Sequence, residues 1–324
     1  MMTAIRWRAL LLLAAAGLVL CAGCRRESPS EPAAAARLQV VTTLFPLYDF
    51  ARVIAGGRAE VRLLLPPGSE PHTFEPKPDD ILAINRASLF IYTNRYLEPW
   101  AEDLVKGVPR DRLTVVDASS GLVLLDAAAG HDHGHGAMEE GHHDEPSGKD
   151  PHIWLDLANA EAMVDTILAG FVAKDPANRN YYSANAAAYK GKLAELDRRY
   201  QITLGTCKNR TLLHAGHAAF AYLARRYGIT YVSATGVAAD AQTTPARMAE
   251  LVKQVRALKL QYIFSEELVS PRVAETIASE TGARILRLHA AHNVGKGELA
   301  SGLTFLGLME KNLATLATGL QCSQ

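Results

Sequence analysis

Histidine side chains are the groups in this sequence best suited to chemistry, because a neutral imidazole nitrogen binds transition metals. Six of the eleven histidines lie outside one His-rich segment: His72, His152, His214, His217, His289 and His292. Most of them follow a predicted strand, and open α/β sheets bind ligands at the carboxyl ends of their strands. If these rings converge, they form a nitrogen-rich site, which favours Zn2+ over Mn2+ or Mg2+.

His72 and His152 lie in short, restricted stretches. His72 follows the strand predicted at 60–65, in a turn stiffened by prolines and a glycine. His152 stands between Asp150 and Asp156, and either carboxylate could orient its ring. Taken alone, each histidine has the alternative role of a hydrogen-bonded structural residue.

His214 and His217 flank a predicted strand-to-helix junction. His214 closes the strand and is expected to pack there or to support the site. His217 is predicted at the first turn of a helix over 217–227, where the helix dipole disfavours imidazolium and keeps the ring neutral. His289 and His292 follow the last predicted strand, where a solvated loop is the alternative.

A His-rich segment spans residues 130–145. Its five histidines are His131, His133, His135, His142 and His143. The segment has no apolar periodicity, so it is predicted to be a loop. It is expected to collect Zn2+ weakly, because ordering it costs conformational entropy. The alternative is a solvated insertion whose metal binding has no role.

Predicted strands and helices alternate in two series, which implies largely parallel sheets. The first series holds strands at 38–43, 60–65, 89–92 and 113–116 and helices at 47–55 and 78–87. The second holds strands at 211–213, 229–232, 261–264 and 284–288, helices at 217–227, 245–258 and 271–281, and a closing helix. The predicted fold class is α/β, with two Rossmann-like lobes joined by one long helix.

A regular apolar stripe predicts the long helix. Its residues recur at spacings of three and four: Tyr182, Ala186, Tyr189, Leu193, Leu196, Tyr200 and Leu204. With Asp175 as N-cap, the helix is expected over 176–204, about 40 Å long. The N-terminal lobe then covers 37–175 and the C-terminal lobe 205–324. A stiff helix between lobes predicts little hinge closure.

Residues 1–23 are predicted to be a signal peptide, because two arginines precede an apolar run too short to cross a membrane. The run ends in Cys-Ala-Gly-Cys, which resembles the lipobox of bacterial lipoproteins, with Cys24 as the acylated residue. A signal peptide that is cleaved without lipidation is the alternative. Residues 24–36 are expected to form a flexible tether.

Cysteine usage agrees with export. After removal of the leader, Cys207 and Cys322 remain besides Cys24. In an oxidising compartment these two can form one disulfide, and two separate buried thiols are the alternative.

The balanced charge of the chain argues against a polyanionic partner such as nucleic acid. Lys+Arg and Asp+Glu are both 34, and hydrophobic residues make up 48% of the chain. These values are typical of a soluble globular protein and predict no nucleic-acid binding.

Four separated segments, at 42–48, 68–74, 150–154 and 216–220, resemble the zinc/manganese solute-binding proteins of ABC importers, the cluster A-I or zinc-uptake family. The resemblance runs from about residue 38 to the C-terminus. It implies two lobes joined by a single long helix, with the metal bound between them.

The resemblance also implies a ligand set. The first three ligands map onto His72, His152 and His217, and the third is a carboxylate in manganese-binding relatives, so His217 favours zinc. The fourth position is usually an aspartate or water, and the nearest match here is His292. Glu70, Glu266 and solvent are alternatives.

The expected function is that of an extracytoplasmic component of a high-affinity zinc import system, which binds Zn2+ and delivers it to a membrane permease and its ATPase. It is expected to be a monomer, periplasmic or at the cell surface, lipid-anchored to a bacterial membrane, and not an enzyme. A manganese or iron carrier of the same fold is one alternative. A zinc hydrolase, which needs an open coordination position and a general base, is another. The sequence neither supports nor excludes surface adhesion.

Overall fold

The computed structural model describes residues 37–109, 111–127, 148–237, 243–267 and 270–323. The predicted signal peptide, tether, Cys24 and His-rich segment therefore lie outside the described residues. Within the described part, no helix combines the length and apolar character needed to cross a membrane.

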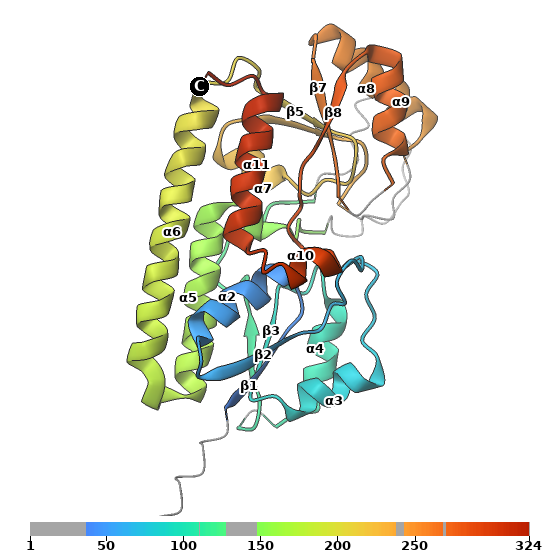
Figure 1. Cartoon of the computed structure of the whole chain (residues 1–324). Coiled ribbons are helices and arrows are strands. Elements are labelled where there is room, and N and C mark those ends of the chain that lie inside the picture. Colours follow the sequence, from blue (N-terminus) through green and yellow to red (C-terminus); the bar gives the residue numbers. More distant parts are fainter. Residues whose placement is uncertain (1–36, 110, 128–147, 238–242, 268–269, 324) are drawn as a thin grey trace, which may run out of the picture. The chain divides into compact units, whose positions relative to one another are not determined.

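The first half of the chain forms a parallel four-stranded sheet in the order β2-β1-β3-β4 (Figure 1). Its strands are β1 (Leu38–Thr42), β2 (Ala59–Leu63), β3 (Leu89–Tyr92) and β4 (Thr114–Asp117). Its helices are α2 (Phe45–Ala55), α3 (Pro78–Arg86), α4 (Pro99–Val105) and α5 (Leu157–Lys174). Every residue of β3 is buried, as expected for a central parallel strand covered on both faces. Helix α4 was not among the predicted elements.

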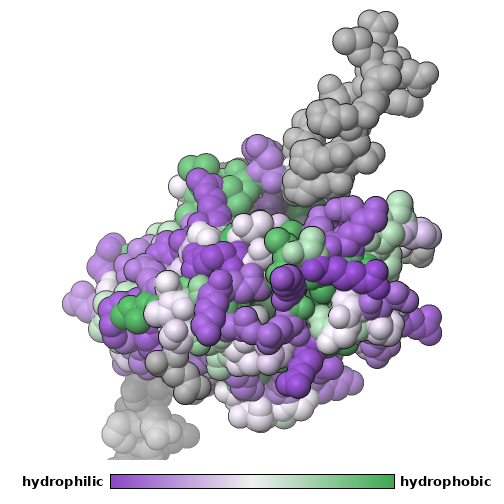
Figure 2. Space-filling view, turned by 90° about the horizontal axis from the view of Figure 1, so that it is seen from above, coloured by the Kyte–Doolittle hydropathy of each residue, from purple (hydrophilic) through white to green (hydrophobic). Residues whose placement is uncertain are grey.

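The second half repeats this topology in a sheet with the order β6-β5-β7-β8. Its strands are β5 (Thr211–His214), β6 (Thr230–Ser233), β7 (Tyr262–Ser265) and β8 (Arg284–Arg287). Its helices are α7 (Ala221–Arg226), α8 (Pro245–Ala257), α9 (Arg272–Thr281), α10 (Lys296–Ala300) and α11 (Phe305–Gly319). The prediction of an α/β fold with two parallel sheets is confirmed. Figure 2 shows one face of the molecule, where hydrophilic and hydrophobic side chains are interspersed.

The long helix is α6 (Arg179–Gly205), which packs against α5, α2 and α11 (Figure 1). All seven residues of the predicted apolar stripe are buried in it. The predicted start is wrong by one turn, because Pro176–Asn178 form a separate 3-10 turn. The Asp175 carboxylate does not cap α6 but accepts hydrogen bonds from Asn178 Nδ2 and the Tyr182 hydroxyl.

Helix α7 begins at Ala221, four residues after the predicted start at His217. The preceding backbone is engaged elsewhere: the amide of Ala215 donates to Phe264 O and that of Ala218 to Gly236 O. These long-range bonds compete with the first helical turn. His217 therefore lies in a loop between β5 and α7.

Cys207 and Cys322 form the predicted disulfide. Cys207 follows α6 and Cys322 follows α11, so the bridge ties the end of the last helix to the end of the long one. It closes a long segment, with a sequence separation of 115.

Removing this bridge in a Cys207→Ser/Cys322→Ser variant is expected to lower the free energy of unfolding by about 2–4 kcal/mol, mainly because the unfolded chain gains freedom. Urea unfolding of the two proteins measures the difference. Equal unfolding free energies would show that the bridge contributes no stability. Zinc affinity should be unchanged, since neither cysteine belongs to the histidine group described below.

Candidate metal centre

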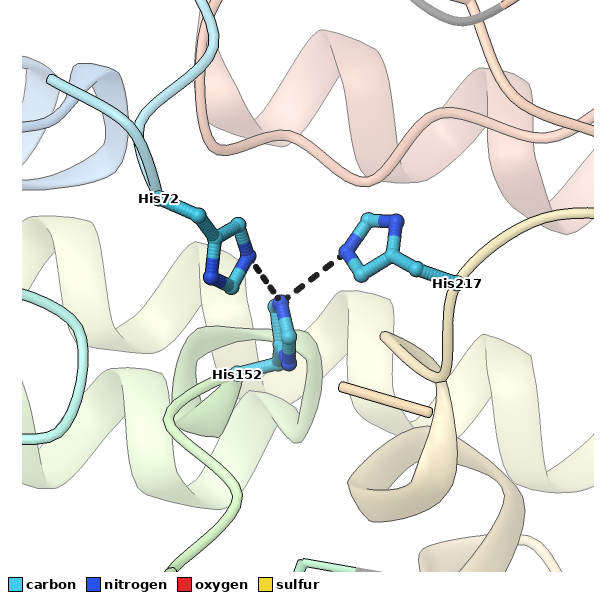
Figure 3. A group of neighbouring side chains, drawn as sticks. All are labelled: His72, His152 and His217. Carbon is cyan, nitrogen blue, oxygen red and sulfur yellow. Dashed lines mark hydrogen bonds between the residues drawn. The ribbon is translucent and has the colours of Figure 1, made fainter. Parts of the chain in front are cut away.

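Three histidine rings from separate segments of the chain converge (Figure 3). Nε2 of His152 lies 3.2 Å from Nε2 of His72 and 3.1 Å from Nε2 of His217. One ligand atom from each of the three residues lies within 4.8 Å of the others, the spacing that a single metal ion requires. His72 follows β2, His152 precedes the 3-10 turn Ile153–Leu155 and α5, and His217 follows β5. The group therefore joins both halves of the chain.

Local hydrogen bonds and one glycine shape the turn that carries His72. Gly68 has φ +85°, a conformation that side chains disfavour. The Ser69 amide donates to Pro66 O at 3.0 Å, and the His72 amide donates to Glu70 Oε1 at 3.1 Å. Glu70 thus shapes the backbone beside His72.

Asp150 fixes the ring of His152. Its Oδ1 accepts hydrogen bonds from the His152 amide at 2.9 Å and from His152 Nδ1 at 2.8 Å. Because Nδ1–H is committed to the carboxylate, the Nε2 lone pair points into the group of three. Asp156, the other predicted acceptor, instead caps α5 through the amides of Ala158 and Asn159.

Glu266, at the end of β7, does the same for His217. Its Oε1 accepts from the His217 amide at 2.7 Å and from His217 Nδ1 at 2.6 Å. Burial alone would lower the pKa of His217, but the hydrogen bond and charge of Glu266 outweigh it and raise the pKa. The predicted reason for a neutral His217 is wrong, because this residue lies in the loop before α7 and not at a helix N-terminus.

Gly216 makes room for this arrangement, a role that the sequence analysis missed. A Cβ at this position would lie 2.8 Å from Cδ of Glu266 and 2.8 Å from Cε1 of His214. Both contacts are closer than packed carbon atoms allow. The only signal in the sequence was a glycine between two histidines.

Burial favours the neutral form of three other rings, those of His72, His152 and His292. Burial lowers the pKa of His72 to about 2 and that of His292 to about 3, and it lowers the pKa of His152 well below its usual value. A neutral ring keeps the lone pair that a metal needs.

His292 lies beside the group of three. Its ring centroid is 6.1 Å from that of His217, and the residue is only 1% exposed. Among the described residues, neither ring nitrogen of His292 has a hydrogen-bond partner. Buried polar atoms without partners are costly, so this ring lacks the structural explanation that the other buried histidines have. The alternative of a solvated loop is wrong for His292.

His214 and His289 have other partners. Nδ1 of His214 donates to the carbonyl of His217 at 3.1 Å, and its Nε2 lies 3.9 Å from Glu266 Oε1. Nδ1 of His289 lies 3.0 Å from Glu267 Oε1, and its backbone is bonded to Asn312. Both residues are buried, and both lie outside the group of three.

Replacing Glu266 by glutamine is expected to weaken zinc binding by about ten- to hundredfold near neutral pH, because the amide cannot match the carboxylate as acceptor for the His217 ring. Gly216→Ala should have a similar effect, since its Cβ displaces the same carboxylate. Competition with a zinc chelator measures both affinities. Wild-type affinity in both variants would show that Glu266 does not orient His217.

Comparisons with known proteins agree with a metal-binding role. A model of the family described as zinc-uptake complex component A, periplasmic (ZnuA) matches residues 40–319. The chain is 34% identical over 317 residues to the high-affinity zinc uptake system protein ZnuA of Bacillus subtilis, covering 97% of this chain and 98% of that protein.

Solved structures show the same fold. The Zn(II)-bound ZnuA-like domain of Streptococcus pneumoniae AdcA matches with a TM-score of 0.73 and 32% identity, covering 88% of this chain and 99% of that one. Full-length AdcA is longer, and this chain spans 60% of it. The laminin-binding protein Lmb of Streptococcus agalactiae, called a bifunctional protein with adhesin and metal transporting activity, matches with a TM-score of 0.76 and 28% identity, covering 88% of this chain and 99% of that one.

Proposed function

Since the chain belongs to the zinc-uptake complex component A family, we propose that it is the solute-binding component of a high-affinity zinc ABC importer. The observation that carries this proposal is the convergence of three Nε2 atoms, from the half-buried His72 and the buried His152 and His217. Proteins of this family work with an ABC permease and its ATPase. The cargo is a single Zn2+ ion, which this chain delivers to that permease.

The ligand set that we propose is His72, His152 and His217, with His292 as the fourth donor. Four imidazoles leave the double charge of the ion without an anionic ligand. Asp150 and Glu266 supply the negative charge without binding the ion. Their carboxylates accept hydrogen bonds from the Nδ1–H groups of His152 and His217. Nitrogen-only ligation favours Zn2+ over Mn2+, which prefers oxygen, so zinc is the better candidate cargo.

Binding explains the site better than catalysis. A zinc hydrolase needs a general base free to activate water. Oδ1 of Asp150 and Oε1 of Glu266 instead accept hydrogen bonds from the backbone amide and the ring of His152 and His217, respectively. One carboxylate oxygen of Glu70 likewise accepts a hydrogen bond from the His72 amide. Manganese or iron transport and adhesion to laminin remain second candidates, the last because of the likeness to Lmb.

We further propose a periplasmic or cell-surface location, anchoring through a lipid on Cys24, and a monomer. A relative, AdcA of Streptococcus pneumoniae, is named a zinc-binding lipoprotein. The proposed lobes are 37–175 and 205–324. The five histidines of segment 130–145 remain candidates for weaker zinc binding.

Metal analysis of protein purified without added metal, followed by competitive titration of Zn2+ against Mn2+, tests this function. We expect one tight zinc equivalent and much weaker manganese binding. Deletion of 130–145 should lower the number of weak zinc equivalents and leave the tight one. Tighter manganese than zinc binding would make the protein a manganese carrier, and zinc-dependent peptidase or esterase turnover would make it an enzyme.

A further inference from the structure

Asn293 connects two segments that each carry a histidine of the proposed site. It lies between β8 and α10 and is fully buried. Its Nδ2 donates to Pro66 O at 2.8 Å and to Ser69 O at 2.7 Å. Both acceptors belong to the turn that leads into His72, while His292 is the residue directly before Asn293.

Backbone hydrogen bonds reinforce this connection. The Gly68 amide donates to Val294 O at 2.9 Å, and the Phe45 amide donates to His292 O at 3.1 Å. The segment around His292 is therefore bonded both to the start of α2 and to the turn of His72. The side chain of Asn293 uses both of its amide hydrogens to bind the turn of His72.

The residue before His292 is held in a strained conformation. Ala291 has φ +58°, in the left-handed region that residues with a Cβ disfavour. Such residues persist only where their surroundings fix them. Here Ala290 O accepts from Trp154 Nε1 at 2.8 Å on one side, and the Asn293 bonds follow on the other. The direction of the His292 side chain is set by this backbone.

We infer that Asn293 is a positioning residue for metal binding: its side-chain amide holds the turn of His72 against the segment of His292. The metal-binding nitrogens from both halves of the chain then keep fixed positions relative to one another. This inference rests on the proposed function. A site whose donors are fixed before the ion arrives gives up less entropy on binding and releases the ion more slowly. Without the amide, the His72 turn and the His292 segment can move apart independently of the remaining two rings.

The test compares Asn293→Leu, which keeps the branched shape and removes the donors, with Asn293→Ala. Asn185→Ala is the matched control, since Asn185 Nδ2 also donates to a carbonyl across elements, Ile54 O at 3.1 Å, away from the histidines. We expect both Asn293 variants to release zinc about tenfold faster or more, while the control releases it at the wild-type rate. The visible absorption of the cobalt-substituted protein should change only in the Asn293 variants.

Melting of the metal-free proteins separates positioning from stability. A general loss of stability would appear in the control as well and would leave the cobalt spectrum unchanged. Wild-type zinc release and an unchanged cobalt spectrum in either folded Asn293 variant would overturn the inference. Failure of the wild-type protein to bind zinc tightly would instead overturn the proposed function.

Discussion

Replacement of His152 by alanine is expected to lower zinc affinity by about a hundredfold or more, the largest loss from any single substitution at this site. Nε2 of His152 lies 3.2 Å from that of His72 and 3.1 Å from that of His217, so it is the atom that both other rings contact. Loss of His72 or of His217 leaves two ligand nitrogens close together. Loss of His152 removes the nitrogen that lies near both of the others.

Competitive titration with a zinc chelator measures this loss in each histidine variant. We expect at least about tenfold weaker binding for His72→Ala and His217→Ala. His292→Ala should lose less, because His292 stands beside the group of three rather than within it. Melting of the metal-free variants controls for folding. Unchanged affinity in a folded variant would remove that histidine from the ligand set.

The framework of the site could be predicted from the sequence because its signals are local. Continuous apolar runs mark central strands such as β3, and a stripe at spacings of three and four marks the buried face of α6. The alternation of the two then predicts parallel sheets. Since each parallel sheet presents the carboxyl ends of its strands at one edge, the histidines after β2 and β5 could be predicted to lie at ligand-binding edges of the two sheets.

The parts that could not be predicted depend on contacts between distant residues. Glu266 is 49 residues from His217, yet it sets the ring orientation and the pKa of that histidine. The loop before α7 replaces a predicted helical turn because its amides bond to Phe264 O on β7 and to Gly236 O after β6. Asn293 is 227 residues from Pro66, and no local pattern signals their hydrogen bond.

Zinc affinity is also expected to fall as the pH falls, but less steeply than four ordinary histidines would produce. Burial holds the pKa of His72 at about 2 and that of His292 at about 3, and it holds the pKa of His152 well below its usual value. These three rings are already neutral in mildly acidic solution. They release no proton when zinc binds, so they add nothing to the pH dependence.

Two other groups are expected to release a proton when zinc binds. Although burial opposes it, Glu266 raises the pKa of His217, and below that pKa a proton occupies the nitrogen that faces the site. Burial raises the pKa of Asp150 to about 7. A zinc ion bound to His152 would favour the ionised form of this carboxylate. Zinc binding displaces the proton on the His217 nitrogen and favours loss of the proton on Asp150. Affinity should therefore rise with pH until both protons are lost in the metal-free protein, and should fall by about ten- to hundredfold per pH unit below that point.

Calorimetric titration in two buffers of different ionisation enthalpy counts the released protons directly, and we expect between one and two in mildly acidic solution. Glu266→Gln is the matched variant: without the carboxylate, burial lowers the pKa of His217, and one proton should disappear from the count. The gap in zinc affinity between wild type and variant should then narrow as the pH falls. Release of three or four protons would mean that the buried rings are charged before zinc arrives, and that neutral donors are not preformed at this site.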